Sequence, residues 1–534
     1  MNNEFVKQVE YNIIYLQDII NKYQQTNNQK IQIIKSSYEN LLNVLQEIKI
    51  GICVNPNLIL DLIEPQNAKI DKIKDVEFSS NFIDETQGLA VKKALAMDNL
   101  LTIQGPPGAG KTTTITEIIK QVKKRSPLSK ILITSQSHVA VDNVIKKLAN
   151  EGFKHDLARV RHTDKTENMM KKYDIDVIYK EIINKSSSNI KKVLDSYNCL
   201  NDNQEYDNAF VSQNRDGFML SKSIIGVTIN SINSCRFGIK GDIDYAIIDE
   251  VGKCSFAEIL MIAQMCKKLI LIGDPKQLPA VMEKFKDEQS FNNEIYDYLS
   301  DNPYISYLFS HINKECRVFL NKQYRMSDAI GEYISDNFYN EPNEKLRNGE
   351  GKKNILIEDA LNFIDYDIRG YEINTANKKE NEDTILMNKR EIEIIEYLLN
   401  NELKSISPKK IAIIAPYIAQ ISEIRKIIGD RIPAENINTV DAFQGREADY
   451  VIFSCVRNFG RPTEFFKEEN RLNVAISRAI EKVYIIGSEY YVTKVSYLKN
   501  FVDFKKNIKG KTVRCNRLYY NGKNIEKNKR SRVN

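Results

Sequence analysis

Cysteine and histidine are sparse in this sequence, and they are not grouped as metal sites require. Its 534 residues include eight cysteines and four histidines, and no two cysteines form a CxxC pair. Zinc ribbons, iron–sulfur clusters and disulfide scaffolds depend on closely spaced ligands or on cysteine frameworks. The composition therefore argues against all three classes.

Long apolar runs are also missing. The longest, such as KKLILIGD, are far shorter than the roughly 20 residues that cross a bilayer, and 28% of the residues are charged. The first residues, MNNEFVKQVEYNIIYLQ, lack the basic flank and the small-residue cleavage site of a secretory signal. These absences predict a soluble intracellular protein, cytoplasmic or nuclear, without a membrane span.

The formal charge of +6 is unevenly distributed along the chain. Residues 494–534 contain 13 basic and 2 acidic residues, a net charge of +11, whereas residues 1–493 contain 64 and 69, a net charge of −5. A basic segment of this kind is either a solvated tail or a nucleic-acid-binding segment. Both alternatives stay open at this point.

Length and apolar content, 42% of the residues, allow three or four domains. From residue 100 onward, short apolar runs alternate with helix-length segments, which predicts parallel sheets covered on both faces. The runs are LLTIQ, KILITS, IIGVTI, YAIIDE and LILIGD, then KIAIIAP, YVIFSC and KVYIIG. We therefore expect an α/β fold with two domains, residues 79–315 and 316–493, followed by a basic C-terminal tail, residues 494–534.

Two other segments have a different pattern. In residues 1–50, apolar residues recur at spacings of three, four and seven around the polar break QQTNN. This predicts two amphipathic helices in a hairpin, within an N-terminal stalk-like region of residues 1–78. Residues 150–222 contain long polar tracts and are predicted to form a helical insertion in the first domain.

A phosphate-binding motif follows the first apolar run. GPPGAGKT fits the pattern GxxxxGK[ST] and precedes a helix-like stretch. In this context backbone N–H groups surround phosphates, Lys111 reaches the β and γ phosphates, and the Thr112 hydroxyl ligates Mg²⁺. The predicted nucleotide-binding residues of this loop are Gly105, Pro106, Pro107, Gly108, Ala109, Gly110, Lys111, Thr112 and Thr113. A P-loop alone leaves kinases, GTPases and motors as alternatives.

Acidic and amide side chains follow two later apolar runs. YAIIDE ends in Asp249, which suits a Mg²⁺ site, and Glu250, which suits a base that orients the attacking water. Gln277 in LILIGDPKQLP would sense the γ phosphate or position water, although a polar turn after a strand is ordinary by itself.

These segments, with several later ones, resemble superfamily 1 helicases, specifically the 5′-to-3′ group that includes the nonsense-mediated decay helicase and senataxin. The matching elements occur in order between about residues 84 and 488. They are FIDETQGLAV, GPPGAGKT, DEVGK, GDPKQLP, QYRM, VDAFQGRE and NVAISRA. The resemblance implies two RecA-like domains with an AAA-type P-loop, and ATP with Mg²⁺ as cofactors.

The resemblance also implies roles for individual residues. Gln87 would read the adenine, Tyr324 would stack on it, and Glu447 would hold the ribose. Arg325 and Arg478 would act as arginine fingers on the γ phosphate of an ATP lying between the two sheets. Each arginine taken singly would more often be a surface ion pair.

Contacts with single-stranded nucleic acid are expected at the positions where this family binds it. Hydroxyl and amide groups can bond phosphates and an aromatic ring can stack on a base, but the same residue types also cap helices and form turns. The candidates are Ser135, Ser137, Asn143, Thr228, Tyr417, Gln420 and Thr439.

The sequence departs from the family pattern in several places. Val251 stands where the family usually has alanine, and Ala280 where it has a second proline. The cysteine- and histidine-rich amino-terminal module of the decay helicase is absent, so no zinc-dependent adaptor binding is expected. Seventy-eight residues before the first domain are too few for both a helical stalk and the small β-barrel of relatives, which predicts a stalk without the barrel.

Together these features predict an ATP-dependent motor that moves along single-stranded RNA or DNA, 5′ to 3′ as the resemblance implies. One alternative is an ATP-gated clamp or ribonucleoprotein remodeller that does not unwind a duplex, which shares every motif above. A second alternative, a P-loop phosphotransferase, leaves QYRM, FQGRE and SRA unexplained.

Overall fold

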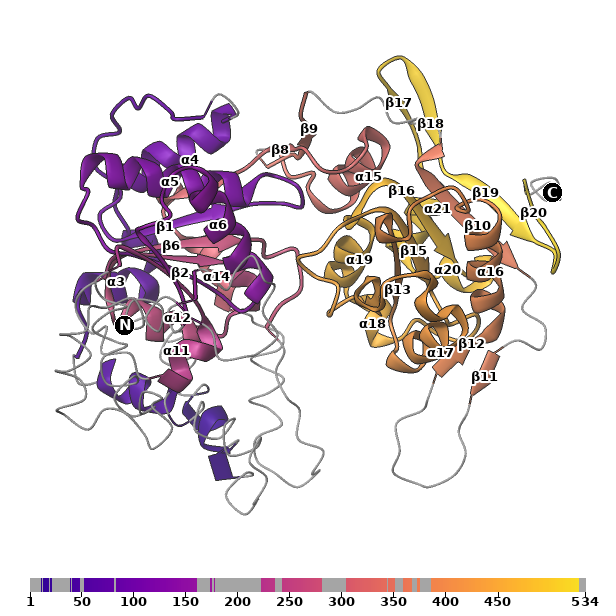
Figure 1. Cartoon of the computed structure of the whole chain (residues 1–534), viewed down its shortest axis with the longest axis horizontal. Coiled ribbons are helices and arrows are strands. Elements are labelled where there is room, and N and C mark those ends of the chain that lie inside the picture. The colour runs from indigo at the N-terminus through magenta and orange to yellow at the C-terminus, as the bar shows by residue number, and fades with distance from the viewer. Residues whose placement is uncertain are drawn as a thin grey trace, which may run out of the picture. The chain divides into compact units, whose positions relative to one another are not determined.

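The computed structural model describes residues 52–80, 83–160, 222–235, 243–280, 304–342, 344–350, 359–366, 372–374 and 386–527, with residues 173, 174 and 177 and parts of the first 48 residues. The chain divides into two compact units (Figure 1). The first unit comprises Met1–Gly105, Gly110–Pro275 and Pro279–Phe319, and the second comprises Pro106–Ala109, Lys276–Leu278 and Leu320–Asn534. Within the described residues, no helix has both the length and the apolar character that a membrane crossing needs.

The first unit is built on a seven-stranded sheet with the order β3-β4-β2-β5-β6-β1-β7, in which every strand pairs in parallel with its neighbours. Its strands are β1 Leu100–Gln104, β2 Ile131–Ser135, β3 Leu157–Arg159, β4 Ile224–Thr228, β5 Ile243–Asp249, β6 Cys266–Gly273 and β7 Arg317–Phe319. Its longer helices are α3 Pro56–Ile63, α4 Glu85–Ala96, α5 Lys111–Arg125, α6 His138–Asn150, α11 Ile229–Cys235, α12 Phe256–Ala263 and α14 Tyr304–His311. Strands β1, β2 and β4 are buried along their whole length, as a parallel sheet covered on both faces requires.

The second unit contains another seven-stranded sheet, with the order β14-β13-β15-β16-β10-β19-β20. Its strands are β10 Leu361–Tyr366, β13 Ile411–Ala415, β14 Ile437–Thr439, β15 Ala448–Ser454, β16 Ala479–Ile486, β19 Asn516–Tyr520 and β20 Ile525–Lys527. Only the last pairing, β19 with β20, is antiparallel among the pairings of this sheet. Its helices are α15 Asp328–Phe338, α16 Lys389–Asn400, α17 Ile418–Ile428, α18 Glu464–Lys467, α19 Glu469–Ile476, α20 Glu489–Val492 and α21 Ser496–Val502.

Three two-stranded sheets complete the second unit. They pair β8 Lys322–Gln323 with β9 Arg347–Asn348, β11 Glu372–Asn374 with β12 Leu386–Asn388, and β17 Lys505–Ile508 with β18 Lys511–Arg514. The prediction of two α/β domains with parallel sheets is therefore confirmed. All eight apolar runs predicted as strands lie in these two large sheets.

The expected boundary between the domains is too early in the chain. β7 follows residue 315, yet it pairs with β1 at the edge of the first sheet. The first unit consequently extends to Phe319. β7 has only three residues, too few for a periodic pattern to reveal.

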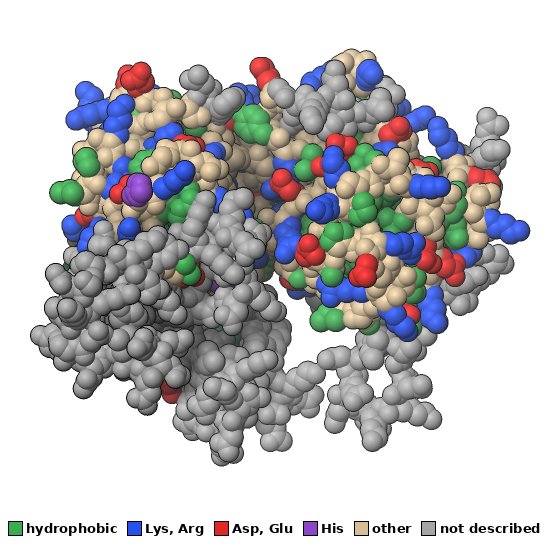
Figure 2. Space-filling view, viewed as in Figure 1, with side chains coloured by type: hydrophobic (Ala, Val, Ile, Leu, Met, Phe, Trp, Pro, Cys, Tyr) green, Lys and Arg blue, Asp and Glu red, His purple; other side chains and the backbone are tan. Residues whose placement is uncertain are grey.

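The segment expected to be a basic tail is folded through Lys527. After α21, β17 and β18 form a hairpin, and β19 then adds to the second sheet beside β10. The prediction of a tail is therefore wrong for these residues. On the visible face of the second unit, basic and acidic side chains are interspersed (Figure 2), and residues 528–534 lie outside the described residues.

The predicted insertion begins later than residue 150. β3 lies inside that range but forms the edge strand of the first sheet. Arg159 in β3 is fully buried and donates from Nε to Asp142 Oδ1 at 2.8 Å. Nearly all of the remaining range, with its predicted helices, lies outside the described residues.

The N-terminal region is partly described. Residues 13–18 and 41–48 are helical, as predicted. Leu16, Leu41 and Leu45 are buried in the same apolar core as Leu58 of α3, so these helices pack onto the first unit. The polar break QQTNN between the two predicted helices lies outside the described residues.

Candidate active site

The loop between β1 and α5 is shaped by two glycines. Gly108 and Gly110 have φ angles of +74° and +77°, a left-handed conformation that glycine adopts without steric cost. Gly110 is the N-cap of α5, so the free N–H groups of the helix N-terminus follow the loop directly. This arrangement binds phosphate groups in other proteins. Lys111 donates from Nζ to the Gly105 carbonyl oxygen at 2.8 Å.

The first turn of α5 carries both predicted threonines. Thr112 and Thr113 are half-buried. The Thr113 hydroxyl accepts a hydrogen bond from Lys147 Nζ at 2.7 Å. Thr112 is therefore the better candidate of the two for a cation ligand.

Gln87 lies beside this loop because of how α4 begins. Asp84 caps the helix and Gln87 closes a capping box, in which its Oε1 accepts from the Asp84 N–H at 3.2 Å. A side chain placed at Gly110 would collide with Gln87 Nε2. The structure thus brings the predicted adenine-reading residue next to the P-loop.

Two carboxylates stand at the end of β5. Asp249 is 4% exposed, and burial together with the charge of Glu250 raises the pKa of Asp249 to about 6, against the opposing effect of Lys111. Glu250 has a φ of +52°, a conformation that costs a non-glycine residue on the order of 1–3 kcal/mol. Its N–H donates to Asp249 Oδ1 at 2.8 Å. Glu250 Oε2 is buried with no hydrogen bond, and the Lys253 ammonium lies 3.9 Å away.

The QYRM turn is organised by Gln323. Its Oε1 accepts from the backbone N–H groups of Arg325 and Met326, at 3.0 and 2.8 Å. The Arg325 side chain approaches Glu447, with Nε 2.5 Å from Oε2. The two side chains predicted to contact the γ phosphate and the ribose therefore contact each other. The Tyr324 ring is 40% exposed and packs against Gly349.

Arg478 is almost completely buried. It donates to the carbonyl oxygens of Val474 and Arg446 and, from Nη2, to Gln277 Oε1 at 3.2 Å. Gln277 belongs to the same compact unit as Arg478. The predicted γ-phosphate sensor and the predicted finger are thus hydrogen-bonded partners.

Sequence comparison finds a protein family and several helicases that are similar to this chain. The AAA domain family matches in two forms, one over residues 83–216 and 184–284 and the other over residues 304–490. The DNA polymerase alpha-associated DNA helicase A of Schizosaccharomyces pombe is 28% identical over 513 residues, covering 88% of this chain and 74% of that protein. An ATP-dependent helicase of Methanocaldococcus jannaschii is 27% identical over 516 residues, covering 84% and 74%. A regulator of nonsense transcripts 1 homolog of Neurospora crassa is 27% identical over 433 residues, covering 77% of this chain and 38% of that protein.

The chain belongs to the superfamily 1 helicases. Within them it is of the type of the nonsense-mediated decay helicase and senataxin. This makes it an ATP-using enzyme.

Two of the candidate nucleic-acid contacts of this helicase lie at the carboxyl ends of neighbouring β-strands. Ser135 ends β2 and pairs in register with Thr228 of β4 and Asp249 of β5. Both hydroxyl residues are buried, and Thr228 Oγ1 lies 2.8 Å from Ser231 Oγ. Ser135 and Thr228 therefore contribute to local structure at this edge.

Other candidates are more accessible. Ser137 is half-buried and Asn143 is exposed on α6, and Thr439 is half-buried at the end of β14. Tyr417 is half-buried, and its hydroxyl lies 3.3 Å from Thr463 Oγ1. These four side chains reach the surface, as a strand contact requires.

Gln420 does not fit the expected strand contact. It is fully buried, and its amide bonds the N–H and the carbonyl oxygen of Asn388 at 2.8 and 3.2 Å and Ser454 Oγ at 3.1 Å. The same network contains Glu391, which accepts from Ser454 Oγ and from the Val456 N–H. Gln420 is therefore a core residue of the second unit, because the first turn of α17 points it inward.

Two further residues inside the motifs position other groups of the site, and the motif sequences alone did not predict this role. Gln323 shapes the turn before Arg325, as described above. Asn473 donates from Nδ2 to the Lys276 carbonyl oxygen and to the Tyr339 hydroxyl, both at 2.7 Å. Their place within QYRM and NVAISRA was the available signal, but the partners of Asn473 are far away in the sequence.

Proposed function

We propose that this helicase hydrolyses ATP with Mg²⁺ and uses the cycle of hydrolysis to move 5′ to 3′ along single-stranded RNA or DNA. The observation that carries the proposal is the buried carboxylate pair after β5, in the chain that also carries the P-loop and two arginines held by motif residues. The direction of movement rests on the family.

The carboxylate pair suits Mg²⁺ in its chemistry. Asp249 is buried with a raised pKa, and Glu250 has a buried oxygen without a hydrogen bond. Buried acidic oxygens of this kind require nearby positive charge, and Mg²⁺ prefers oxygen ligands, among them water and phosphate. Thr112 and Asp249 would hold the ion, which would neutralise negative charge on the phosphates when bound.

Each remaining residue of the site has a distinct role in this proposal. Lys111 neutralises the β and γ phosphates once it exchanges the Gly105 carbonyl for them. Glu250 orients the attacking water, because its free buried oxygen is an acceptor without a competing donor in hydrogen-bond range. Arg478 and Arg325 stabilise charge that develops in the transition state, and Arg325 must leave Glu447 to do so.

Nucleic acid would contact the surface of the first unit that holds Ser137 and Asn143, and the surface of the second unit that holds Tyr417 and Thr439. Their hydroxyl and amide groups suit phosphate oxygens, and the Tyr417 ring suits a base. Contacts of this kind are mainly to the backbone, so they accept RNA and DNA alike. We expect no zinc-dependent adaptor among the partners.

The test is ATP turnover measured with and without single-stranded RNA and single-stranded DNA, together with unwinding of duplexes that carry a 5′ or a 3′ overhang. We expect stimulation by at least one polymer and unwinding of the 5′-overhang duplex. The Glu250→Gln variant is the matched control, since it should bind the same polymers without turnover. Stimulated turnover without any strand separation would favour the ATP-gated clamp, and turnover indifferent to both polymers would overturn the motor.

A further inference from the structure

Helix α15 contacts both segments of the second unit that carry a predicted arginine finger, the one with Arg325 and the one with Arg478. It begins three residues after Arg325, and its N-cap residue Ser327 donates from the backbone N–H to the Ile480 carbonyl oxygen at 2.7 Å, two residues beyond Arg478. At the other end of the helix, the Tyr339 hydroxyl accepts from Asn473. A shift of α15 would therefore move the segments that carry Arg325 and Arg478.

The C-terminal segment supports one side of α15 with aromatic side chains. The Tyr333 ring packs edge-on against Phe501 and Phe504, with ring centroids 5.2 and 5.9 Å apart. The Tyr333 hydroxyl donates to the Tyr497 carbonyl oxygen at 2.7 Å. This side of the contact is apolar and buried, so it fixes where the helix lies.

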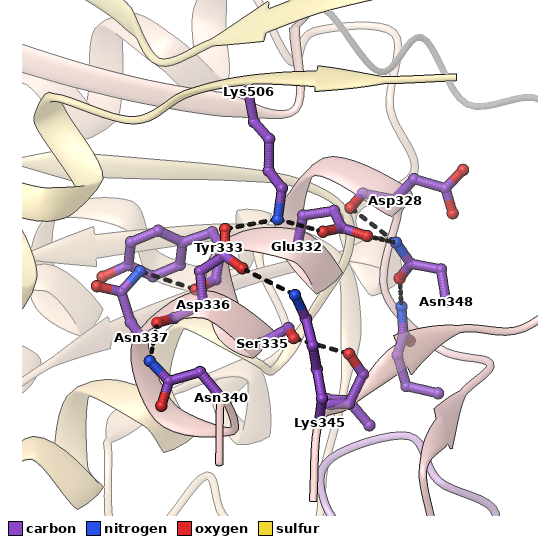
Figure 3. Close-up of polar contacts among 12 residues, drawn as sticks. Asp328, Glu332, Tyr333, Ser335, Asp336, Asn337, Asn340, Lys345, Asn348 and Lys506 are labelled. Carbon is purple, nitrogen blue, oxygen red and sulfur yellow. Dashed lines mark hydrogen bonds and ion pairs between the residues drawn. The ribbon is translucent and has the colours of Figure 1, made fainter. Parts of the chain in front are cut away.

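The β17–β18 hairpin contacts the same helix through two lysines. Lys506 Nζ lies 2.6 Å from both Glu332 Oε2 and Asp336 Oδ2, as the close-up shows (Figure 3). Lys509 Nζ lies 2.6 Å from Asp328 Oδ2, in the first turn of α15. Two lysines of one hairpin thus reach three carboxylates of one helix.

From Glu332 a chain of hydrogen bonds leads back to Arg325. Asn348 donates from Nδ2 to Glu332 Oε1 at 3.1 Å (Figure 3), and its Oδ1 accepts from Gln323 Nε2 at 2.5 Å. Gln323 Oε1 in turn holds the Arg325 N–H. We call Lys506, Glu332, Asn348 and Gln323 the α15 network.

The helix approaches this network closely because of a glycine. A Cβ added at Gly331 would collide with both Asn348 Oδ1 and Gln323 Nε2. Gln323 itself is fully buried, which restricts its side chain to one arrangement. Because the packing is this close, a displacement of Glu332 also displaces Asn348 and Gln323, and with them the backbone of Arg325.

We propose that Lys506 is a positioning residue for ATP hydrolysis, which acts through the α15 network to hold Arg325 in place for the γ phosphate. This inference rests on the finger role of Arg325 in the proposed function. Through this contact the β17–β18 hairpin, which contains none of the family motifs, influences the rate of ATP hydrolysis.

The charge state of Lys506 is compatible with this role. Burial alone would lower its pKa, but the Asp336 and Glu332 carboxylates outweigh burial and raise the pKa. The lysine therefore stays protonated at any pH at which the enzyme is assayed. A partly exposed ion pair such as this one contributes little to stability by itself, so the expected effect is on rate and not on folding.

The test is a double-mutant cycle on basal ATP turnover, measured without nucleic acid. Lys506→Met should lower kcat by on the order of tenfold or more, as misplacement of a catalytic group does, with less than about a twofold change in KM for ATP because ground-state binding is not touched. Lys506→Arg should restore most of the rate. In an Arg325→Ala background, Lys506→Met should have no further effect on kcat, because residues that act through one another are not additive.

Controls separate this inference from misfolding and from the proposed function. Lys505→Met changes an exposed neighbour on the opposite face of β17 and should leave kcat unchanged. If Lys506→Met melts early, Asn348→Ala interrupts the same network away from the hairpin and should give the same loss of kcat. A normal kcat in both variants, or a loss that adds to that of Arg325→Ala, overturns the inference. A normal kcat in Arg325→Ala itself would instead overturn the finger role.

Discussion

The two units of this helicase hold their functional groups by different means. In the first unit, backbone geometry does most of the positioning: the left-handed Gly110 ends the P-loop and begins α5, and strand register sets Ser135 beside Thr228 and Asp249. In the second unit, Arg325 and Arg478 depend on side-chain hydrogen bonds from residues far away in the sequence. A loop and a strand end are local features, whereas a network such as that of α15 is not.

The largest effect is expected at the phosphate site of the first unit, where backbone geometry positions the functional groups. Lys111→Ala should lose ATP binding, because the lysine supplies the positive charge for the phosphates. Glu250→Gln should keep binding but lower turnover by about 10²- to 10⁴-fold, since an amide cannot act as the acceptor for the attacking water. Equilibrium nucleotide titration beside steady-state turnover separates the two outcomes.

This prediction has an internal control in Lys253→Met, which removes the ammonium 3.9 Å from Glu250 without touching a phosphate-binding residue. It should bind ATP normally. Near-wild-type turnover in both Lys111→Ala and Glu250→Gln would exclude this site as the place of hydrolysis.

The next effect tests the arginines of the second unit. Arg325→Ala and Arg478→Ala should each lower kcat by about 10³-fold or more, the range measured for arginine fingers elsewhere, with KM for ATP comparatively unchanged. Arg478→Ala also leaves Gln277 without a hydrogen bond that it has now. Gln277→Ala should therefore lower kcat less than Arg478→Ala does, and normal turnover in both arginine variants would rule out a role for the second unit in hydrolysis.

Sequence reasoning succeeded where the signal was local and failed where it was not. Continuous apolar runs marked the central strands, because strands buried on both faces are apolar throughout. The three-residue edge strands β3 and β7 carry too few residues for any pattern. β19, with the sequence NRLYY and four partly or fully exposed positions besides its buried end, was hidden by the basic composition around it.

The same distinction explains the predicted site. Asp249, Glu250 and the P-loop could be located because each follows a recognisable strand. Gln420 was misjudged because position after a strand does not reveal whether a helix turns a side chain inward. The contact between Lys506 and Asp336 joins residues 170 positions apart, and no spacing rule could suggest it.

A smaller effect separates core from surface within the second unit. Gln420→Leu should lower the free energy of unfolding of this unit by about 1–3 kcal/mol, because it leaves buried groups of Asn388 unbonded, while strand affinity stays unchanged. Tyr417→Ala should do the reverse, weakening single-strand binding through a lost stacking contact worth about 1–3 kcal/mol per base. Denaturant melts and binding titrations on both variants would decide; a loss of strand affinity in folded Gln420→Leu would contradict its assignment to the core.

The smallest expected effect concerns the basic residues that follow β20 in the sequence. Because β20 spans Ile525–Lys527, a truncation must spare it, so we consider removal of residues 528–534, which contain Lys529, Arg530 and Arg532. If these cations contact the backbone of a strand, each lost contact should flatten the dependence of log affinity on log salt by about 0.7, while basal ATP turnover stays unchanged. A full-length variant with the three residues changed to glutamine separates charge from chain length. Equal affinity and equal salt slope in all three proteins would show that this segment has no role in strand binding, and would leave the basic residues of the β17–β18 hairpin to act only within the fold.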